Sequence, residues 1–466
     1  MVEDSLFTPR SVAIVGATSN PQKRGNSTIR FLERGAFRGA IYPVNPKYQE
    51  VLGYKCYPTL KEIPGPVDHV VCCLPAHSVP ALAKECVEKG VKLLHVYTAG
   101  FSETGIPERI ELEQQVIGIS RQGKLRILGP NCMGVYRPSV GLAFNIHSPK
   151  ETGSVSVISQ SGGNASDLGR MASARGLRFN KVISYGNAAD INETELLDFL
   201  GRDSGTKVVG AFIEGVRDMP GFLKTLSVVS RSKPVVIVKG GTTEAGARAA
   251  AAHTGAVASR ESWDAVWKET EAVSVSNMEE LIDVLLVFQS LRAPAGRNVG
   301  VIGIGGGDAI QAADDLEVAG LSVPGLKQET QAAMREFTPL PGTSVNNPLD
   351  LNVMRQGPEL QRILELTAGE DAIHALIVVL RVDQTLGNPK GEKTFAEMMD
   401  TVEQFHATSP KPMIIVSRAL GSLEAFAAGL KLQEKFDRIG VPVYPSITRA
   451  AHALGKFVRF VASSQM

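Results

Sequence analysis

The run AAAAHTGAVAS, from Ala249 to Ser259, places a histidine among alanine and glycine residues. Small neighbours let a second surface approach the imidazole of His253 within bonding distance, which a nucleophile that passes a phosphoryl group between two sites requires. Glu214 ends the apolar run VVGAFI, and its carboxylate is a candidate to hold the other ring nitrogen of such an imidazole. Equally, His253 can be an ordinary surface histidine and Glu214 a solvated loop acid, so the pair alone leaves both interpretations open.

The stretch SQSGGN follows the apolar run VSVI, and together they predict a strand, a glycine turn and the start of a helix. The backbone N–H groups and the dipole of a helix start, roughly half a positive charge, favour an anion such as phosphate. Gly162 and Gly163 leave room for it, and the hydroxyls of Ser159 and Ser161 can add donors. The alternative is that serine and asparagine merely cap the helix.

A second glycine turn, GATSNPQKRGN, follows the apolar run SVAIV near the start of the chain. It is not GxGxxG, so the dinucleotide-binding fingerprint is absent. It can hold a nucleotide-like ligand at a helix start, with Lys23 and Arg24 supplying charge for phosphates, or it can be a plain tight turn.

The elements that position these groups alternate between apolar runs and helical patterns. In the first part of the chain, each of the runs GAIYPVNP, VDHVVCCLP, VKLLHVYTAGF and LRILGPNCMG ends in glycine, proline or asparagine. This alternation predicts a parallel, doubly wound sheet whose ligands bind at the carboxyl ends of the strands. We place this Rossmann-like domain at residues 1–145.

An internal repeat follows the first domain. Residues 154–177, SVSVISQSGGNASDLGRMASARGL, align without gaps on residues 298–321, NVGVIGIGGGDAIQAADDLEVAGL. Matched glycines and a closing Gly-Leu favour duplication over a coincidence of two generic αβ units. We expect two flavodoxin-like, doubly wound domains at residues 146–291 and 297–466, joined by the linker RAPAGR. Asp308 would repel a phosphate in the second copy, so the anion site is expected in the first.

The composition excludes several function classes. The chain has 466 residues, 43% hydrophobic and 21% charged, with a net charge of +1, which is typical of a globular protein of about three domains that binds neither nucleic acid nor membrane. No apolar run is long enough to span a membrane, and no signal peptide is apparent. The cysteines lack CxxC spacing, so we expect reduced thiols in the cytoplasm and no metal site; they are Cys56, Cys72, Cys73, Cys86 and Cys132.

The motifs GPNCMG, SQSGG and HTGA, in this order, resemble the NDP-forming acyl-CoA synthetase superfamily. The resemblance covers essentially the whole chain and is greatest to the α subunits of ADP-forming acetate–CoA ligases; the α subunit of succinyl-CoA synthetase is more distant. It implies a Rossmann-like CoA-binding domain followed by two flavodoxin-like domains. The family often has alanine after its SQSG, where this chain has Gly163 and Asn164, which puts the acyl specificity in doubt.

The resemblance also assigns roles to residues. His253 would be phosphorylated during turnover, and Glu214 would steady it. The residues that would contact CoA are Gly16, Thr18, Ser19, Lys23, Lys47, Pro75 and Ala76. The residues that would form the phosphate and acyl pocket are Asn131, Cys132, Ser159, Ser161, Gly162 and Gly163.

The implied reaction interconverts an acid, CoA and ATP with acyl-CoA, ADP and phosphate, through acyl phosphate and phosphohistidine. No segment reads as the ATP-grasp domain of such ligases, and no GxxxxGK[ST] occurs. We therefore expect a separate ATP-grasp β subunit that holds Mg-ATP or Mg-ADP, in an α2β2 assembly. The acid is left open between acetate, a branched acid and an aryl acid.

Two other functions compete with this one. A CoA-sensing or scaffold protein could keep the fold without turnover, although the joint presence of His253, Glu214 and SQSGG speaks against it. A nicotinamide dehydrogenase could use the first domain, but it lacks GxGxxG.

Overall fold

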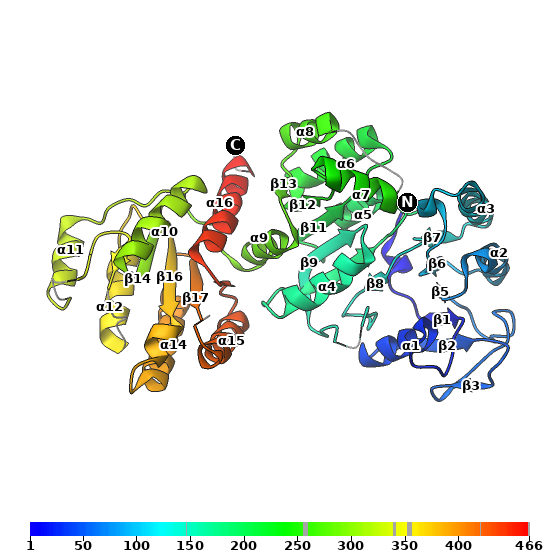
Figure 1. The fold of residues 1–466 in the computed structure, drawn as a ribbon, viewed down its shortest axis with the longest axis horizontal. Helices are drawn as coiled ribbons and strands as arrows, with labels where there is room; N and C mark the ends of the chain where they lie inside the picture. Colours follow the sequence, from blue (N-terminus) through cyan, green and yellow to red (C-terminus); the bar gives the residue numbers. More distant parts are fainter. Residues whose placement is uncertain (146, 255–259, 339–341, 352–356, 420, 465–466) are drawn as a thin grey trace. The chain divides into compact units, whose positions relative to one another are not determined.

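The computed structural model describes residues 1–466 apart from 146, 255–259, 339–341, 352–356, 420 and 465–466, and apart from the side chains of 252–254, 260, 261 and 304. The chain forms two compact units, Met1–Leu281 and Ile282–Met466. Unit 1 contains two large sheets and unit 2 contains one, each built mainly of parallel strands and flanked by helices (Figure 1). The chain is thus an α/β protein, as predicted.

The first sheet of unit 1 is parallel throughout, in the order β2-β1-β5-β6-β7. Its strands are β1 (Ser11–Val15), β2 (Ala40–Val44), β5 (His69–Cys72), β6 (Leu93–Val96) and β7 (Arg126–Leu128). Its helices are α1 (Arg24–Arg34), α2 (Val79–Lys89) and α3 (Pro107–Gly123), and a small hairpin is formed by β3 (Glu50–Val51) and β4 (Tyr54–Lys55). The central strands are short, fully buried runs, which is typical of a sheet covered on both faces.

The second sheet of unit 1 has the order β13-β12-β11-β9-β10-β8, and only β8 is antiparallel to its neighbour. Its strands are β8 (Gly134–Tyr136), β9 (Thr152–Ser159), β10 (Phe179–Ser184), β11 (Val208–Ile213), β12 (Val235–Lys239) and β13 (Val273–Val275). The accompanying helices are α4 (Gly162–Ser173), α5 (Glu193–Arg202), α6 (Met219–Ser232), α7 (Glu244–Thr254) and α8 (Arg260–Glu269). Helix α9 (Met278–Ser290) contains the boundary between the two units, which falls after Leu281.

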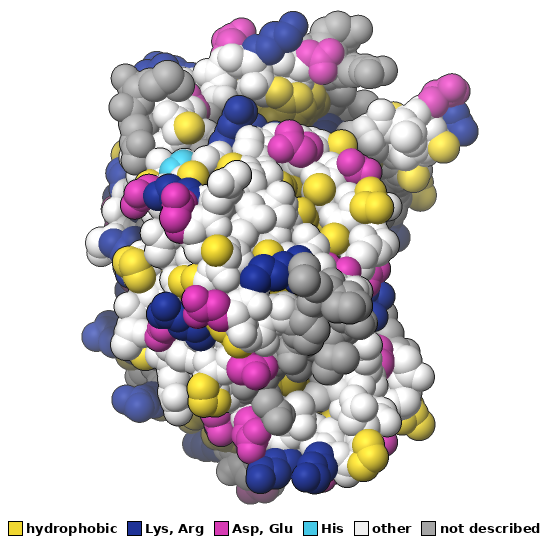
Figure 2. All heavy atoms as spheres, turned by 90° about the vertical axis from the view of Figure 1, so that its left-hand side faces the viewer, with side chains coloured by type: hydrophobic (Ala, Val, Ile, Leu, Met, Phe, Trp, Pro, Cys, Tyr) yellow, Lys and Arg dark blue, Asp and Glu magenta, His cyan; other side chains and the backbone are white. Residues whose placement is uncertain are grey.

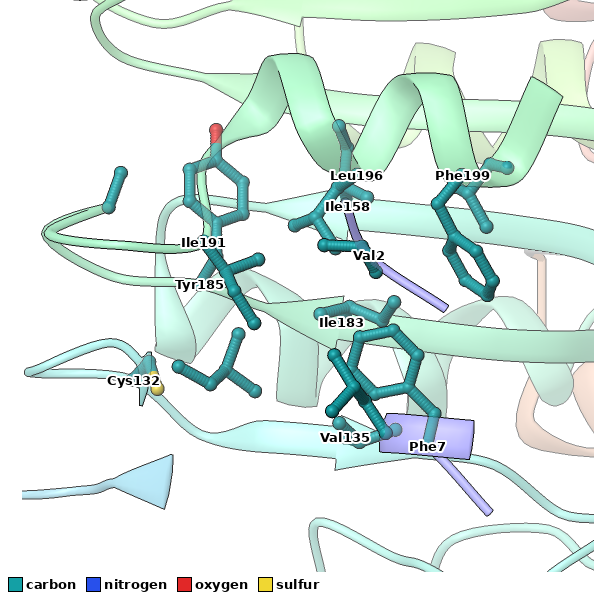
Figure 3. Packing of buried hydrophobic residues seen from close by; sticks show 14 of the residues in the cluster. Val2, Phe7, Cys132, Val135, Ile158, Ile183, Tyr185, Ile191, Leu196 and Phe199 are labelled. Carbon is teal, nitrogen blue, oxygen red and sulfur yellow. The ribbon is translucent and has the colours of Figure 1, made fainter. Parts of the chain in front are cut away.

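One hydrophobic core connects the two sheets of unit 1. Val2 and Phe7, near the start of the chain, are fully buried and pack with residues of β8, β10 and α5 (Figure 3). The rings of Phe7 and Phe199 lie 5.4 Å apart between centroids. Because this core is shared, the strand-end loops of the two sheets keep a defined spacing.

Unit 2 has one parallel sheet in the order β15-β14-β16-β17-β18. Its strands are β14 (Val299–Ile304), β15 (Leu349–Asp350), β16 (Ala375–Arg381), β17 (Met413–Arg418) and β18 (Val443–Tyr444). Its helices are α10 (Gly306–Val318), α11 (Gln328–Arg335), α12 (Gly357–Ala368), α13 (Val382–Leu386), α14 (Gly391–Thr408), α15 (Leu423–Arg438) and α16 (Ile447–Ser464). On the face shown in Figure 2, acidic and basic side chains are interspersed, in keeping with the net charge of +1.

The two halves of the sequence repeat have the same local structure. Each copy forms a strand, a glycine turn and a helix, β9–α4 in the first and β14–α10 in the second. Both helices lead into a left-handed glycine, Gly176 with φ 90° and Gly320 with φ 83°. The next residue then donates its N–H back to the helix, from Leu177 to Ala172 and from Leu321 to Leu316, each at 3.0 Å.

The domain boundaries proposed from the sequence, 1–145, 146–291 and 297–466, stay predictions. In the described part of the chain, every helix is too short or too polar to cross a membrane.

Candidate functional site

Three loops of the first sheet meet at the carboxyl ends of the adjacent strands β2, β1 and β5. Gly16 follows β1 with φ 92°, a backbone conformation that side chains disfavour, and its N–H donates to the Val44 carbonyl of β2 at 3.0 Å. A Cβ atom at this glycine would lie 3.1 Å from the carbonyl oxygen of Cys73, just after β5. The glycine therefore allows the three strand ends to approach one another.

The loops after β1 and β2 are held together by polar contacts. The hydroxyls of Thr18 and Tyr48 lie 3.1 Å apart, and the Asn45 side chain donates to the Ala17 carbonyl at 2.7 Å. Three of the residues predicted to bind CoA lie on these two loops and are exposed: Ser19, Lys23 and Lys47. The sequence-based set thus lies on adjoining loops, with its lysines free to face a ligand from solvent.

The loop after β5 contains Pro75 and Ala76, the other two residues predicted to bind CoA. Pro75 precedes the short helix η2 (Ala76–Ser78), and the Thr98 hydroxyl, from the loop after β6, donates to the Leu74 carbonyl at 2.5 Å. All three groups of predicted CoA contacts are therefore carried by the neighbouring strands β2, β1 and β5.

The GPNC segment connects the two sheets of unit 1. Asn131 has φ 57° and donates its N–H to the Thr98 carbonyl at 3.0 Å, while Asn187, just after β10, donates its N–H to the Pro130 carbonyl at 3.0 Å. A Cβ atom at Gly186 would lie 2.2 Å from that same carbonyl oxygen, so glycine is required at this crossing. The pocket residues predicted on GPNC thus lie beside the strand ends of the second sheet.

Cys132 is a buried thiol and not a nucleophile. It is 3% exposed, and its Sγ donates to the Val96 carbonyl at 3.8 Å (sulfur visible in Figure 3). Burial raises the pKa of this thiol to about 12, so it stays protonated at neutral pH. Cys132 therefore has a structural role beside the predicted acyl pocket.

The SQSGG turn begins α4, as predicted, and its serines are engaged. Ser161 is the N-cap, and its hydroxyl accepts a hydrogen bond from the Asn164 N–H at 3.3 Å. The Ser159 hydroxyl donates to the Ser161 carbonyl at 2.7 Å. Capping is thus present, and an anion would be met by the first-turn N–H groups at Gly162 and Gly163 more than by hydroxyl donors.

Glu214 follows β11, next to β9, and is 8% exposed. The Gln160 side-chain oxygen accepts from the N–H groups of Glu214 at 2.8 Å and Gly215 at 3.0 Å, and the Lys239 ammonium donates to the Glu214 carbonyl at 2.9 Å. Burial lowers the pKa of Lys239, against the influence of the Glu214 carboxylate. Sequence reasoning missed both partners, although Gln160 lies inside SQSGG and Lys239 ends a predicted strand.

His253 lies on α7, which follows β12. Thr243 begins this helix, accepting from the Ala247 N–H at 2.7 Å and, through its hydroxyl, from the Gly246 N–H at 3.1 Å. The helix packs against η3 (Ser102–Thr104), which belongs to the first sheet's loops. The side chain of His253 lies outside the described residues, so its contact with Glu214 stays a prediction.

A polar network around the buried side chains of Asn187 and Glu113, also missed from the sequence, holds η3 against the second sheet. The Asn187 side chain donates to Glu103 at 2.5 Å and to Glu113 at 3.2 Å, and Arg217 donates to the Asn187 carbonyl at 3.0 Å. The network fixes the surface on which α7 packs. Its members are separated by long stretches of sequence and share no recognisable motif.

Two family models match the chain, the CoA binding domain over residues 10–138 and the succinyl-CoA ligase like flavodoxin domain over residues 152–288. The α subunit of ADP-forming acetate–CoA ligase II from Pyrococcus furiosus is 32% identical over 97% of both chains. The α subunit of its isoform I is also 32% identical, over 98% of this chain and 97% of the relative. The ADP-forming acetate–CoA ligase of Methanocaldococcus jannaschii is 36% identical over 74% of this chain, which matches only 48% of that longer relative.

Solved structures resemble the chain over nearly its full length. The dinucleotide forming acetyl-coenzyme A synthetase 1 of Ca. Korarchaeum cryptofilum, solved in complex with phosphate and ADP, has a TM-score of 0.85 at 28% identity and covers 99% of this chain and 97% of its own. PH0766 from Pyrococcus horikoshii has a TM-score of 0.83 at 27% identity and covers 99% of this chain and 100% of its own. With these relatives, this chain belongs to the ADP-forming acyl-CoA synthetases, a family of acid–CoA ligases.

Proposed function

We propose that this chain is the CoA-binding, α-type subunit of an ADP-forming acyl-CoA synthetase that works through a phosphohistidine at residue 253. The observation that carries the proposal is the meeting of four strand-end loops of unit 1 in two pairs. GPNC touches the loop after β10 through Asn187 and Pro130, and the SQSGG turn holds the Glu214 turn through Gln160. A CoA thiol, a phosphate and a histidine-borne phosphoryl group can meet only where such loops adjoin.

The chemistry divides into three transfers. ATP gives its terminal phosphoryl group to an imidazole nitrogen of His253, releasing ADP. The carboxylate of the acid then attacks phosphorus, the N–P bond breaks, and acyl phosphate forms. Finally the CoA thiolate attacks the acyl carbon, the C–O bond to phosphate breaks, and acyl-CoA and phosphate leave. The reverse order makes ATP from acyl-CoA.

The residues of this chain would act mainly by position and charge. Glu214 accepts a hydrogen bond from the ring nitrogen of His253 that does not carry phosphorus, and so fixes the orientation of the imidazole. The first-turn N–H groups of α4, at Gly162 and Gly163, bind the phosphate that is transferred or released. CoA would lie across Gly16, Thr18, Ser19, Lys23, Lys47, Pro75 and Ala76. Asn131 and Cys132 would border the acyl group.

The nucleotide would bind to a separate subunit. Relatives whose own length is matched to 97% are named α subunits, whereas the ADP-forming acetate–CoA ligase I from Archaeoglobus fulgidus extends well beyond this chain, since the match spans 54% of that protein. We propose an ATP-grasp partner in an α2β2 assembly. Its Mg²⁺ would neutralise the charge of the ATP phosphates.

Reconstitution with a candidate ATP-grasp subunit tests the function. We expect sustained ADP release, beyond the single equivalent that phosphorylation of His253 produces, only when the carboxylic acid, CoA and both subunits are present together, with acyl-CoA as the product. A CoA-binding scaffold would instead bind CoA and show no ADP release with any acid. The matched variants are Glu214→Gln, expected to slow turnover by about 10²-fold or more, and Glu244→Gln on the exposed start of α7 as the control.

A further inference from the structure

The first sheet of unit 1 borders a cavity that no assigned role explains. Its volume is about 40 Å³, and it lies between strands β1, β5 and β6, helix α1 and the segment that follows GPNC. Most of its lining is apolar. Its lining includes the side chains of Arg24, His69, His95, Tyr97, Met133 and Phe144.

Two buried histidines give the cavity polar walls. His69 is 3% exposed, and within the described part of the chain neither of its ring nitrogens has a hydrogen-bond partner. His95 is 5% exposed, its Nε2 lies 3.1 Å from the Cys132 carbonyl, and the two ring centroids are 6.0 Å apart. An unpaired buried polar group is costly, so His69 is suited to a ligand that brings its own hydrogen-bonding group.

The two imidazoles are neutral. Burial lowers the pKa of His69 to about 3 and that of His95 to about 4, so at neutral pH each ring has one N–H donor and one acceptor nitrogen. A neutral hydroxyl, which both donates and accepts, matches such a ring better than a carboxylate or an ammonium group does.

Met133 connects the cavity to the candidate site. Its side chain lines the cavity, and a Cβ atom at Gly162, in the first turn of α4, would lie 3.0 Å from its Cγ. Its N–H donates to the Ser184 hydroxyl at 3.1 Å, which holds the residue against the second sheet. Across the cavity, the guanidinium carbon of Arg24 lies 4.0 Å from the centre of the Tyr97 ring. The Met133 side chain thus separates the first turn of α4 from the cavity, and an acyl group whose carbonyl lies beside Gly162 enters the cavity by displacing this flexible side chain.

The size of the cavity limits what can enter. A water needs roughly 10–15 Å³ of such space, so about three or four non-hydrogen atoms fit. We propose that the cavity receives the acyl chain of a short aliphatic acid that ends in a hydroxyl group, and that His69 hydrogen-bonds this hydroxyl. The inference rests on the proposed function, because that function brings the acyl carbonyl to α4. It makes His69 and Met133 specificity-determining residues.

Binding of CoA thioesters to the full chain tests the inference. We expect 4-hydroxybutyryl-CoA to bind about tenfold more tightly than butyryl-CoA in calorimetric titrations, because the hydroxyl completes the hydrogen bonding of His69. His69→Phe should abolish the difference and leave the affinity for free CoA unchanged. His69→Gln, which keeps a donor and an acceptor, should retain part of the preference.

His452→Phe, at an exposed position of α16, is the matched control and should keep the full preference. Equal affinities for the two thioesters in the wild-type chain would overturn the inference, as would a preference that survives His69→Phe. Both results leave the proposed function intact if free CoA still binds. Failure of all three ligands to bind would overturn the inference and the proposed function together. If His69→Phe does not fold, the wild-type comparison and His69→Gln decide.

Discussion

The side-chain oxygen of Gln160 accepts the backbone N–H of Glu214 at 2.8 Å, which fastens the turn that presents the carboxylate to the turn that begins α4. The same oxygen accepts the N–H of Gly215 at 3.0 Å. Two parts of the proposed chemistry, the acid that orients the imidazole and the helix that binds phosphate, are therefore joined by one buried side chain.

Gln160→Leu should remove both of these hydrogen bonds. Two buried N–H groups would lose their acceptor, and we expect the free energy of unfolding to fall by about 2–4 kcal/mol. Turnover should fall further than stability explains, because Glu214 is no longer held. Urea unfolding and steady-state kinetics measure the two effects. Gln160→Glu, which keeps an acceptor oxygen, is the control for stability, and a leucine variant as stable and active as the wild type would refute the role.

The lysines on the loops after β1 and β2 should bind the phosphates of CoA. Lys23→Ala and Lys47→Ala should each weaken CoA binding about five- to tenfold, with a smaller dependence of affinity on salt, because each variant removes one exposed charge from the ligand's path. Calorimetry at two salt concentrations measures both effects. Lys431→Ala, exposed on α15, is the control. If both loop variants bind CoA with the affinity of the wild type, neither lysine contacts the phosphates of CoA.

Ser161 offers a test that separates capping from anion binding. Asparagine and aspartate both cap helices well, so Ser161→Asn and Ser161→Asp should each retain stability within about 1 kcal/mol. Only aspartate places a negative charge where phosphate is proposed to bind, and it should block phosphate-dependent cleavage of acyl-CoA by the reconstituted enzyme. CoA binding should survive in both variants. If the aspartate variant cleaves acyl-CoA as fast as the asparagine variant, the helix start is only a cap.

The buried histidines predict a pH dependence of stability. Burial lowers the pKa of His69 to about 3 and that of His95 to about 4, from 6.5. Below pH 6.5 the unfolded chain therefore binds protons that the folded chain does not, and each histidine makes stability fall by about 1.4 kcal/mol per pH unit on acidification. Glu193 acts in the opposite direction, since burial raises its pKa from 4.5 to about 7 and the folded chain holds the proton.

The His69→Phe variant isolates one of these contributions. Between pH 6.5 and 5, its free energy of unfolding should depend on pH less steeply than that of the wild type, by about 1.4 kcal/mol per unit. Urea unfolding at several pH values gives the two slopes. Identical slopes would mean that His69 is protonated in the folded chain.

Much of the fold could be predicted from the sequence because short apolar runs that end in glycine, proline or asparagine are a strong signal of buried parallel strands. The turn after β1, the N-cap at Ser161 and the closing glycines of the repeat all depend on local backbone chemistry. The link from Gln160 to Glu214 and the network around Asn187 do not depend on local backbone chemistry. They join residues far apart in the chain, and their partners are chosen by strand order and packing, which no local pattern encodes.

The cavity between β1, β5, β6 and α1 was likewise beyond sequence reasoning. His69 and His95 occupy strand positions that read as ordinary interior residues, and only the strand register brings their rings together. The role of Met133 depends on its closeness to Gly162, which begins α4 after a strand of the other sheet.

Phosphorylation of His253 is the central claim, and rapid quenching tests it most directly. With its ATP-grasp partner and ATP labelled at the terminal phosphate, the chain should acquire a label at His253 that is lost at low pH and stable at high pH. The carboxylic acid substrate and CoA together should discharge this label at least as fast as the enzyme turns over. His253→Asn should fold, bind CoA, take up no label and show no net turnover. Steady turnover by the wild-type pair with no phosphohistidine at any quench time would contradict the account.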